Sequence, residues 1–276
     1  MRPSWLSLGF IGLVQASSRL RPVLWRWWYN SLASKDKAGQ LLFMNYGYAD
    51  DDRKLALVLR PEDEPFRFSI QLYAKAVSEV DLKDKDLLEV GCGRGGGGTF
   101  LIRYHEPRAY TGVDLSESAV RWCKQNAQFS NARWLQGAAD ALPVPNECMD
   151  VVVNVESSHC YPSLPAFLSE VVRVLRPGGY FAFCDMRTTE RIAELEGDIE
   201  RSGLRKIERR EITQQVLRAL ECISGDRETQ IARSVPRLLR PVFRDFVASK
   251  DTVFYDMLAK RKMVYVSYLL QKPVIN

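Results

Sequence analysis

Histidine is nearly absent from this chain: His105 and His159 are its only two residues of that type among 276. The six cysteines contain no C-x-x-C pair, so the usual spacings of a cysteine and histidine zinc site are missing, and we expect no metal. A chain of this length can bury a sizeable core without disulfides. We therefore expect reduced thiols and a cytoplasmic location.

The chain also lacks a basic stripe and a long hydrophobic run. Its net charge is +5, but the basic residues are interspersed with acids, which argues against nucleic acid as a partner. The apolar run over residues 6–14 is too short to span a bilayer. Arginines and tryptophans follow it, so residues 1–35 predict an amphipathic helix that covers a site. Contact with a membrane surface and a signal peptide are the alternatives.

Strand and helix patterns alternate in the middle of the chain, which predicts an α/β fold with a mostly parallel, Rossmann-like sheet and helices on both faces. The expected strands cover residues 86–90, 109–114, 132–136, 150–155 and 180–185. The expected helices cover residues 70–80, 99–105, 116–123 (with Ser116 as the N-cap) and 164–175.

Four regions are expected along the chain. Residues 1–80 form an N-terminal helical cap, and residues 81–187 form the core. Residues 188–240 are polar and carry no strand signal, which predicts a helical insertion over the carboxyl edge of the sheet. Residues 241–276 complete the core with two last strands, over 243–247 and 263–271.

The first core strand ends in a glycine-rich turn, Glu89-Val-Gly-Cys-Gly-Arg-Gly95, followed by three more glycines. Glycine permits a sharp turn and a close approach of backbone to ligand, and the next helix presents its N-terminus there. Asp114 closes the second strand, where a carboxylate can accept hydrogen bonds from both hydroxyls of a ribose. The glycine spacing also satisfies a dinucleotide pattern, so a nicotinamide oxidoreductase is an alternative.

Four later segments follow in order: 137–143, 149–154, 156–159 and Leu175-Arg-Pro-Gly-Gly179. With the glycine turn, they resemble the class I methyltransferases of the methyltransferase type 11 group. The resemblance implies S-adenosyl-L-methionine as the cofactor. The contacts that it implies are Glu89, Gly91, Gly93 and Gly95 for the methionine part, Asp114 for the ribose, and Ala138 and Ala139 for the adenine. The family usually carries an acid where this chain has Ala138, and Asp140 is the substitute at hand.

A narrower resemblance extends beyond the core. The segments Trp25-Arg-Trp-Trp-Tyr29, Phe43-x-Asn45-x-Gly47-Tyr48 and Asn154–Pro162 resemble the mycobacterial phthiotriol/phenolphthiotriol dimycocerosates methyltransferases. That family implies O-methylation of a hydroxyl on a hydrophobic polyketide or lipid. A sterol-type C-methyltransferase and a degenerate cofactor-binding partner subunit are the alternatives. Asn154 and Tyr48 are further expected cofactor contacts, and the sequence leaves the oligomeric state open.

His159 follows the fourth strand, and ligands bind at the carboxyl ends of such strands. An unperturbed imidazole pKa of about 6.5 suits proton removal near neutral pH, so His159 is the predicted catalytic base, with plain packing as the alternative. Glu156 is predicted to orient His159 or to hold the acceptor, with a structural ion pair as its alternative. His105 is predicted to be a surface residue.

Overall fold

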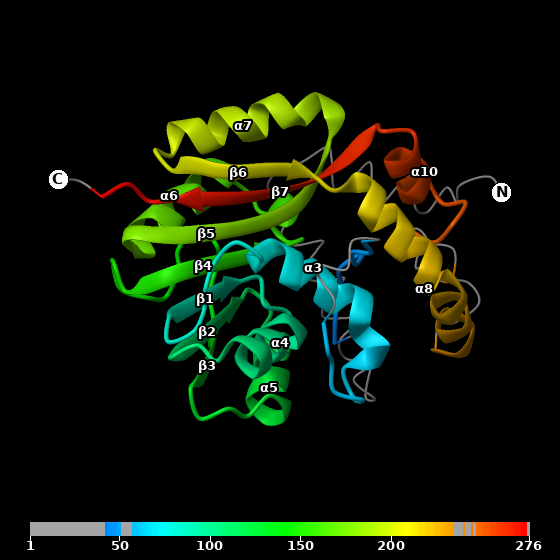
Figure 1. Ribbon diagram of the computed structural model, residues 1–276, viewed down its shortest axis with the longest axis horizontal. Coiled ribbons are helices and arrows are strands. Elements are labelled where there is room, and N and C mark those ends of the chain that lie inside the picture. Colours follow the sequence, from blue (N-terminus) through cyan, green and yellow to red (C-terminus); the bar gives the residue numbers. More distant parts are fainter. Residues whose placement is uncertain (1–41, 51–56, 235–239, 241–243, 245–246, 275–276) are drawn as a thin grey trace.

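The computed structural model describes residues 42–50, 57–234, 240, 244 and 247–274. These residues contain one seven-stranded sheet in the order β3-β2-β1-β4-β5-β7-β6 (Figure 1). The strands are β1 (Asp86–Val90), β2 (Ala109–Asp114), β3 (Ala132–Gln136), β4 (Met149–Val155), β5 (Leu175–Thr188), β6 (Arg205–Glu211) and β7 (Met263–Gln271).

Five adjacent strands of the sheet, from β3 to β5, are parallel, and β7 lies antiparallel between β5 and β6. The chain order reverses between β1 and β4, and such a reversal opens a crevice at the carboxyl ends of the strands. The predicted fold class, a Rossmann-like and mostly parallel sheet, is confirmed.

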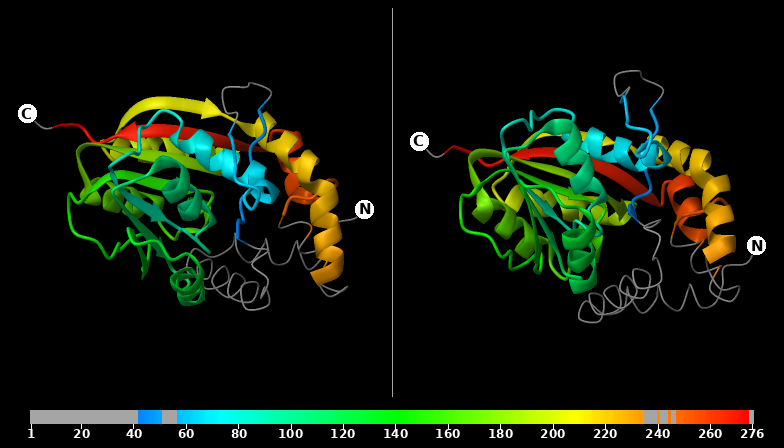
Figure 2. Two further views of the ribbon diagram at one scale, coloured as in Figure 1. Left: turned by 60° about the horizontal axis from the view of Figure 1, so that its bottom comes forward. Right: turned by 90° about the horizontal axis from the view of Figure 1, so that it is seen from below.

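Helices cover both faces of the sheet. On one face lie α3 (Arg67–Val77), α4 (Gly96–His105) and α5 (Glu117–Asn126), and on the other lie α6 (Leu164–Val174) and α7 (Ile192–Arg201). Each group buries its own hydrophobic cluster against the sheet. The helices α8 (Thr213–Ser234) and α10 (Val253–Ala259) lie beyond the carboxyl edge (Figure 2). Short 3-10 helices cover Glu64–Phe66, Ser158–Cys160 and Thr189–Arg191.

Local sequence explains where two of the helices begin. The Ser116 hydroxyl accepts a hydrogen bond from the Ala119 backbone N–H at 3.2 Å, so the predicted N-cap of α5 is confirmed. By contrast, α4 begins at Gly96, three residues earlier than predicted. Glycine disfavours a helix, but a Cβ at Gly97 would lie 2.0 Å from Tyr73 Cζ. The first turn of α4 therefore needs glycine in order to pack.

Two secondary-structure predictions fail in the second half of the chain. Residues 188–240 do contain a strand, β6, in which every residue except Ile207 is charged. Charged residues suit an exposed edge strand, and this one forms by pairing with β7 rather than by its own periodicity. The expected strand over 243–247 is wrong at its described residues, because Arg244 is helical and Val247 lies in a turn.

The predicted cap over residues 1–80 lies mostly outside the described residues, and the predicted helix in it begins at Arg67 and ends at Val77. The N-terminal helix expected over residues 1–35 lies wholly outside them. Within the described part of the chain, we find no helix with both the length and the apolarity that a membrane span requires.

Candidate active site

A cavity of about 280 Å³ opens at the carboxyl ends of β1, β2 and β4, where the chain order reverses. Several predicted site residues line it together: Gly91, Gly93, Asp114, Ala138, Ala139 and Glu156. Asp140 also lines it, two positions from Ala138. Leu42, Phe43, Met44 and Asn45 also line the cavity, although no sequence pattern had placed them there.

The glycine turn is shaped by backbone conformation and by close packing. Gly91 has a φ of 78° and Gly93 a φ of 52°, both in the left-handed region that glycine enters without strain. A Cβ at Gly91 would lie 2.4 Å from the Ser157 hydroxyl oxygen. Gly95 precedes α4 as its N-cap residue. It does not belong to the described lining of the cavity. Backbone rather than side chains therefore faces a ligand here.

Asp114 ties the end of β2 to the glycine turn. One carboxylate oxygen accepts from the Gly93 backbone N–H at 2.8 Å, and the other accepts from the Ser116 backbone N–H at 2.8 Å. Burial raises the pKa of Asp114, although both backbone N–H groups act to lower it. Each oxygen still has acceptor capacity for a ligand hydroxyl, because a carboxylate has about four lone-pair positions.

Glu89 lies behind the turn, in the core. Its carboxylate accepts from the Tyr73 hydroxyl at 2.8 Å and from the Tyr110 hydroxyl, and the residue is 1% exposed. Burial raises the pKa of Glu89 to about 7, against the two tyrosine hydrogen bonds, which lower it. Tyr73 itself lines the cavity, so Glu89 supports the cofactor side of the site through a tyrosine.

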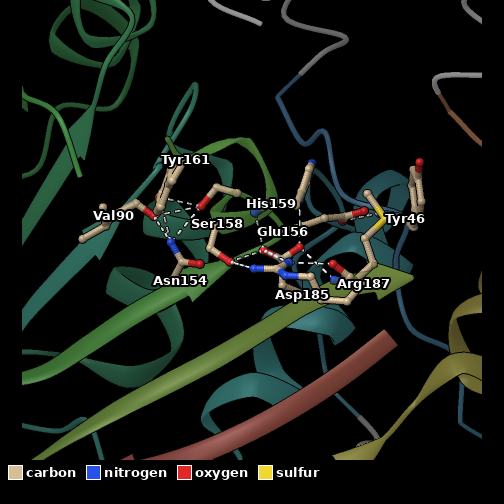
Figure 3. Close-up of polar contacts among 11 residues, drawn as sticks. Tyr46, Val90, Asn154, Glu156, Ser158, His159, Tyr161, Asp185 and Arg187 are labelled. Carbon is tan, nitrogen blue, oxygen red and sulfur yellow. Dashed lines mark hydrogen bonds and ion pairs between the residues drawn. The ribbon is translucent and has the colours of Figure 1, made fainter. Parts of the chain in front are cut away.

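Asn154 and Tyr48 are also set back from the cavity, since the described lining includes neither. The Asn154 amide nitrogen donates to the Val90 carbonyl at 2.9 Å and to the hydroxyls of Ser157 and Tyr161 at 2.8 Å each (Figure 3). Asn154 thus joins the end of β1 to the loop after β4. The Tyr48 hydroxyl donates to Asp50 at 2.7 Å.

His159 pairs with Asp185, a residue that the sequence analysis missed (Figure 3). The Nδ1 atom of His159 lies 2.8 Å from Asp185 Oδ1, and Asp185 is fully buried within β5, three residues before the strand ends. The second Asp185 oxygen accepts from the His159 backbone N–H at 2.9 Å and lies 3.2 Å from an Arg187 nitrogen. The available signal was a lone carboxylate ending a buried strand, but sequence does not show which residue faces it.

The electrostatics of this pair favour a charged imidazole. Burial lowers the pKa of His159, but the neighbouring Cys160 and Asp185 raise it by more, so that it lies well above 6.5. Burial likewise raises the pKa of Asp185, but the charges of His159 and Arg187 outweigh that effect and hold it below its usual value. The charge of Asp185 therefore stabilises the imidazolium form of His159 relative to the neutral form.

His159 lines a second, smaller cavity of about 160 Å³, together with Arg187, Arg191 and Glu194. Tyr161 and Pro162 line both cavities, so the loop after β4 separates the two spaces. Cys160 lines the larger one.

Glu156 was predicted to orient His159, but the bond that orients the imidazole comes from Asp185. The Glu156 carboxylate instead accepts from the Tyr46 backbone N–H at 2.7 Å. His105, predicted on the surface, is partly buried: its ring packs edge-on against Phe100, and burial lowers its pKa. No group of three or more potential metal ligands is clustered among the described residues.

A mostly parallel sheet whose glycine turn and strand-two carboxylate meet in one cavity is the arrangement of a Rossmann-like nucleotide-cofactor site. Consistent with this, residues 88–183 match the methyltransferase domain family. The chain is 38% identical over 249 residues to the phthiotriol/phenolphthiotriol dimycocerosates methyltransferase of Mycobacterium leprae (strain TN), with 90% of this chain and 92% of that protein covered.

The fatty-acid O-methyltransferase of Mycolicibacterium smegmatis (strain ATCC 700084 / mc(2)155) is 36% identical over 245 residues, with 89% of this chain and 88% of that protein covered. The chain therefore belongs to the same family of S-adenosyl-L-methionine-dependent methyltransferases as these relatives. It is an enzyme of that class, and the nicotinamide oxidoreductase alternative is wrong.

Solved structures show the same fold at low sequence identity. The cyclase SpnF superposes with a TM-score of 0.64 at 16% identity, covering 95% of this chain and 96% of that one. A geranyl diphosphate C-methyltransferase from Streptomyces coelicolor A3(2) gives a TM-score of 0.57 at 16% identity, covering 88% and 97%. Because one of these proteins is a cyclase, the fold alone does not define the reaction.

Proposed function

We propose that this enzyme transfers a methyl group from S-adenosyl-L-methionine to a hydroxyl of a hydrophobic lipid or polyketide. The observation that carries the proposal is the pairing of His159, on the loop that borders the cofactor cavity, with Asp185 on β5. The names of two relatives support the acceptor class, since one acts on phthiotriol lipids and the other on fatty acids.

The residues of the larger cavity fit the proposed cofactor. The backbone of Gly91 and Gly93 leaves room for the methionine part, and Asp114 offers carboxylate oxygens to the ribose hydroxyls. Ala138 and Ala139 lie at the end of β3, where they would frame the adenine. When bound, S-adenosyl-L-methionine supplies an electrophilic methyl group and a thioether leaving group.

The protein must then orient the acceptor oxygen and take its proton. Because Asp185 accepts at Nδ1, it holds the imidazole tautomer whose Nε2 is basic. We place the acceptor hydroxyl where the two cavities adjoin, at Tyr161 and Pro162, within reach of the His159 loop. His159 removes the proton as the oxygen attacks, and Asp185 stabilises the imidazolium that results.

The sterol-type C-methyltransferase reading is the second candidate, because it shares the core motifs and because a C-methyltransferase has the same fold. The two reactions leave different products. Incubating the enzyme with methyl-labelled cofactor and long-chain alcohols should yield a methyl ether, identified by mass spectrometry and NMR. A new carbon–carbon bond, or no methylation of any hydroxyl-bearing lipid, would contradict the proposal.

A further inference from the structure

Glu156 has an unusual backbone at the point where β4 ends. Its φ is 53°, in the left-handed region, which costs a non-glycine residue about 1 kcal/mol or more. The Glu156 N–H donates to the Cys184 carbonyl at 2.7 Å, which fixes this conformation against β5. Strain of this kind is kept where a particular side chain is needed in a particular direction.

The Glu156 side chain spans from the sheet to residues 42–48, a segment that we call the N-terminal wall. The first four residues of this wall line the larger cavity. Two hydrogen bonds attach the wall to α3. The Asn45 side-chain amide donates to the Ser69 carbonyl at 3.2 Å, and the Tyr48 backbone N–H donates to the Phe68 carbonyl at 2.9 Å.

The bond from the Tyr46 N–H to the Glu156 carboxylate, at 2.7 Å, joins the wall to the strand-four side of the cavity (Figure 3). Tyr46 is 5% exposed, so water competes little for this charge-assisted bond. On β7, the Tyr265 hydroxyl lies in the same buried region: burial and the nearby Glu156 charge both raise its pKa.

We propose that Glu156 is a positioning residue that holds the N-terminal wall across the cofactor cavity and so slows release of the cofactor and its product. Leu42, Phe43, Met44 and Asn45 of the wall line the cavity, so a bound ligand leaves faster once the Tyr46 bond that holds the wall is lost. This role differs from proton removal and from binding the acceptor. It concerns cofactor affinity alone and does not depend on which acceptor the enzyme methylates.

The substitutions Glu156→Gln and Glu156→Ala separate positioning from charge-based catalysis. Glutamine keeps a carbonyl oxygen that can accept from the Tyr46 N–H, but it lacks the negative charge and cannot take a proton. Alanine removes the acceptor altogether. Positioning therefore requires glutamine to rescue most of the function, whereas a base or a charge would be lost equally in both variants.

The test measures S-adenosylhomocysteine binding to the full chain by calorimetry and its release by stopped flow. We expect Glu156→Ala to weaken binding by about tenfold, with most of the change in the release rate, and Glu156→Gln to stay within about threefold of the parent. Hydrogen exchange of the Tyr46 amide should accelerate in the alanine variant and stay slow in the glutamine variant. Glu190→Ala, at an exposed site, controls for loss of a glutamate.

Glu156→Gly provides a variant that folds even if alanine does not, because glycine relieves the left-handed strain while also removing the carboxylate. It should release S-adenosylhomocysteine as fast as the alanine variant does. Unchanged binding in both the alanine and glycine variants would overturn the proposal. Equal loss of turnover in the glutamine and alanine variants, with normal S-adenosylhomocysteine affinity, would overturn it in favour of a catalytic carboxylate.

Discussion

Asp114 and His159 both depend on residues that are distant in the sequence but adjacent in the sheet. Asp114 and the glycine turn are 21 residues apart and meet because β1 and β2 are adjacent parallel strands. His159 has its tautomer and charge set by Asp185, on the next strand of the sheet. Single substitutions at the pair therefore test the proton transfer directly.

Replacing His159 with alanine should retain cofactor affinity and lower turnover by about 10²–10⁴-fold, the usual contribution of a positioned base. Calorimetry with S-adenosylhomocysteine and turnover at saturating cofactor would measure the two effects separately. A folded His159→Ala protein with near-normal turnover would exclude the base role.

The pH profile should report the raised pKa of His159. Only the neutral imidazole can accept a proton, so kcat/KM for the acceptor should rise with pH through a value well above 6.5. In Asp185→Asn, Cys160 still raises the pKa of His159 and burial still lowers it, but the contribution of the carboxylate is lost. The rise should therefore move to lower pH while the plateau rate falls. An unshifted profile in a folded variant would show that another group titrates.

At the scale of one element, α4 shows how glycine serves packing. A Cβ at Gly97 would lie 2.0 Å from Tyr73 Cζ, and one at Gly98 would lie 2.3 Å from the Tyr110 hydroxyl oxygen. Both tyrosines bond Glu89, so the ring positions are fixed. The first turn of the helix thus approaches the tyrosine pair more closely than any other residue type allows.

Gly97→Ala should destabilise the protein by about 1–3 kcal/mol or more, because the added methyl forces the Tyr73 ring off its site. A matched control is Gly225→Ala on α8, where no atom of the described residues lies within 4 Å of the added Cβ. That change should stabilise slightly, since alanine favours a helix over glycine by about 1 kcal/mol. Thermal denaturation of both variants would reveal the contrast, and equal midpoints would contradict the packing account.

For the whole molecule, the arrangement of α8 and α10 beyond the carboxyl edge of the sheet is consistent with a covered acceptor region (Figure 2). Residues 1–30, rich in aromatic and aliphatic side chains, are proposed to complete that cover. Deleting them should impair turnover of a hydrophobic acceptor more than S-adenosylhomocysteine binding. Full activity of the truncated protein would defeat this idea, and comparing calorimetry with turnover checks it.

The sequence by itself determined the fold class, the spans of β1, β2, β3, β4 and β7 to within one residue at each end, and the glycine turn. These features are local: hydrophobic runs, glycine and an N-cap serine constrain the backbone wherever they occur. The fifth strand shows the limit, since β5 runs from Leu175 to Thr188 rather than over 180–185. Its extra residues are fixed by pairing with the neighbouring strands.

Only the tertiary structure decided the rest. The charged strand β6 exists because β7 supplies its hydrogen bonds, and periodicity within 205–211 carries no such information. Asp185 meets His159 across 26 residues, and Glu156 meets Tyr46 across 110. Glu89 and Asn154 fit the expected motif, yet both side chains turn into the core. A motif specifies residue types along the chain, whereas the direction of a side chain and its partner depend on which strands the folded sheet makes adjacent.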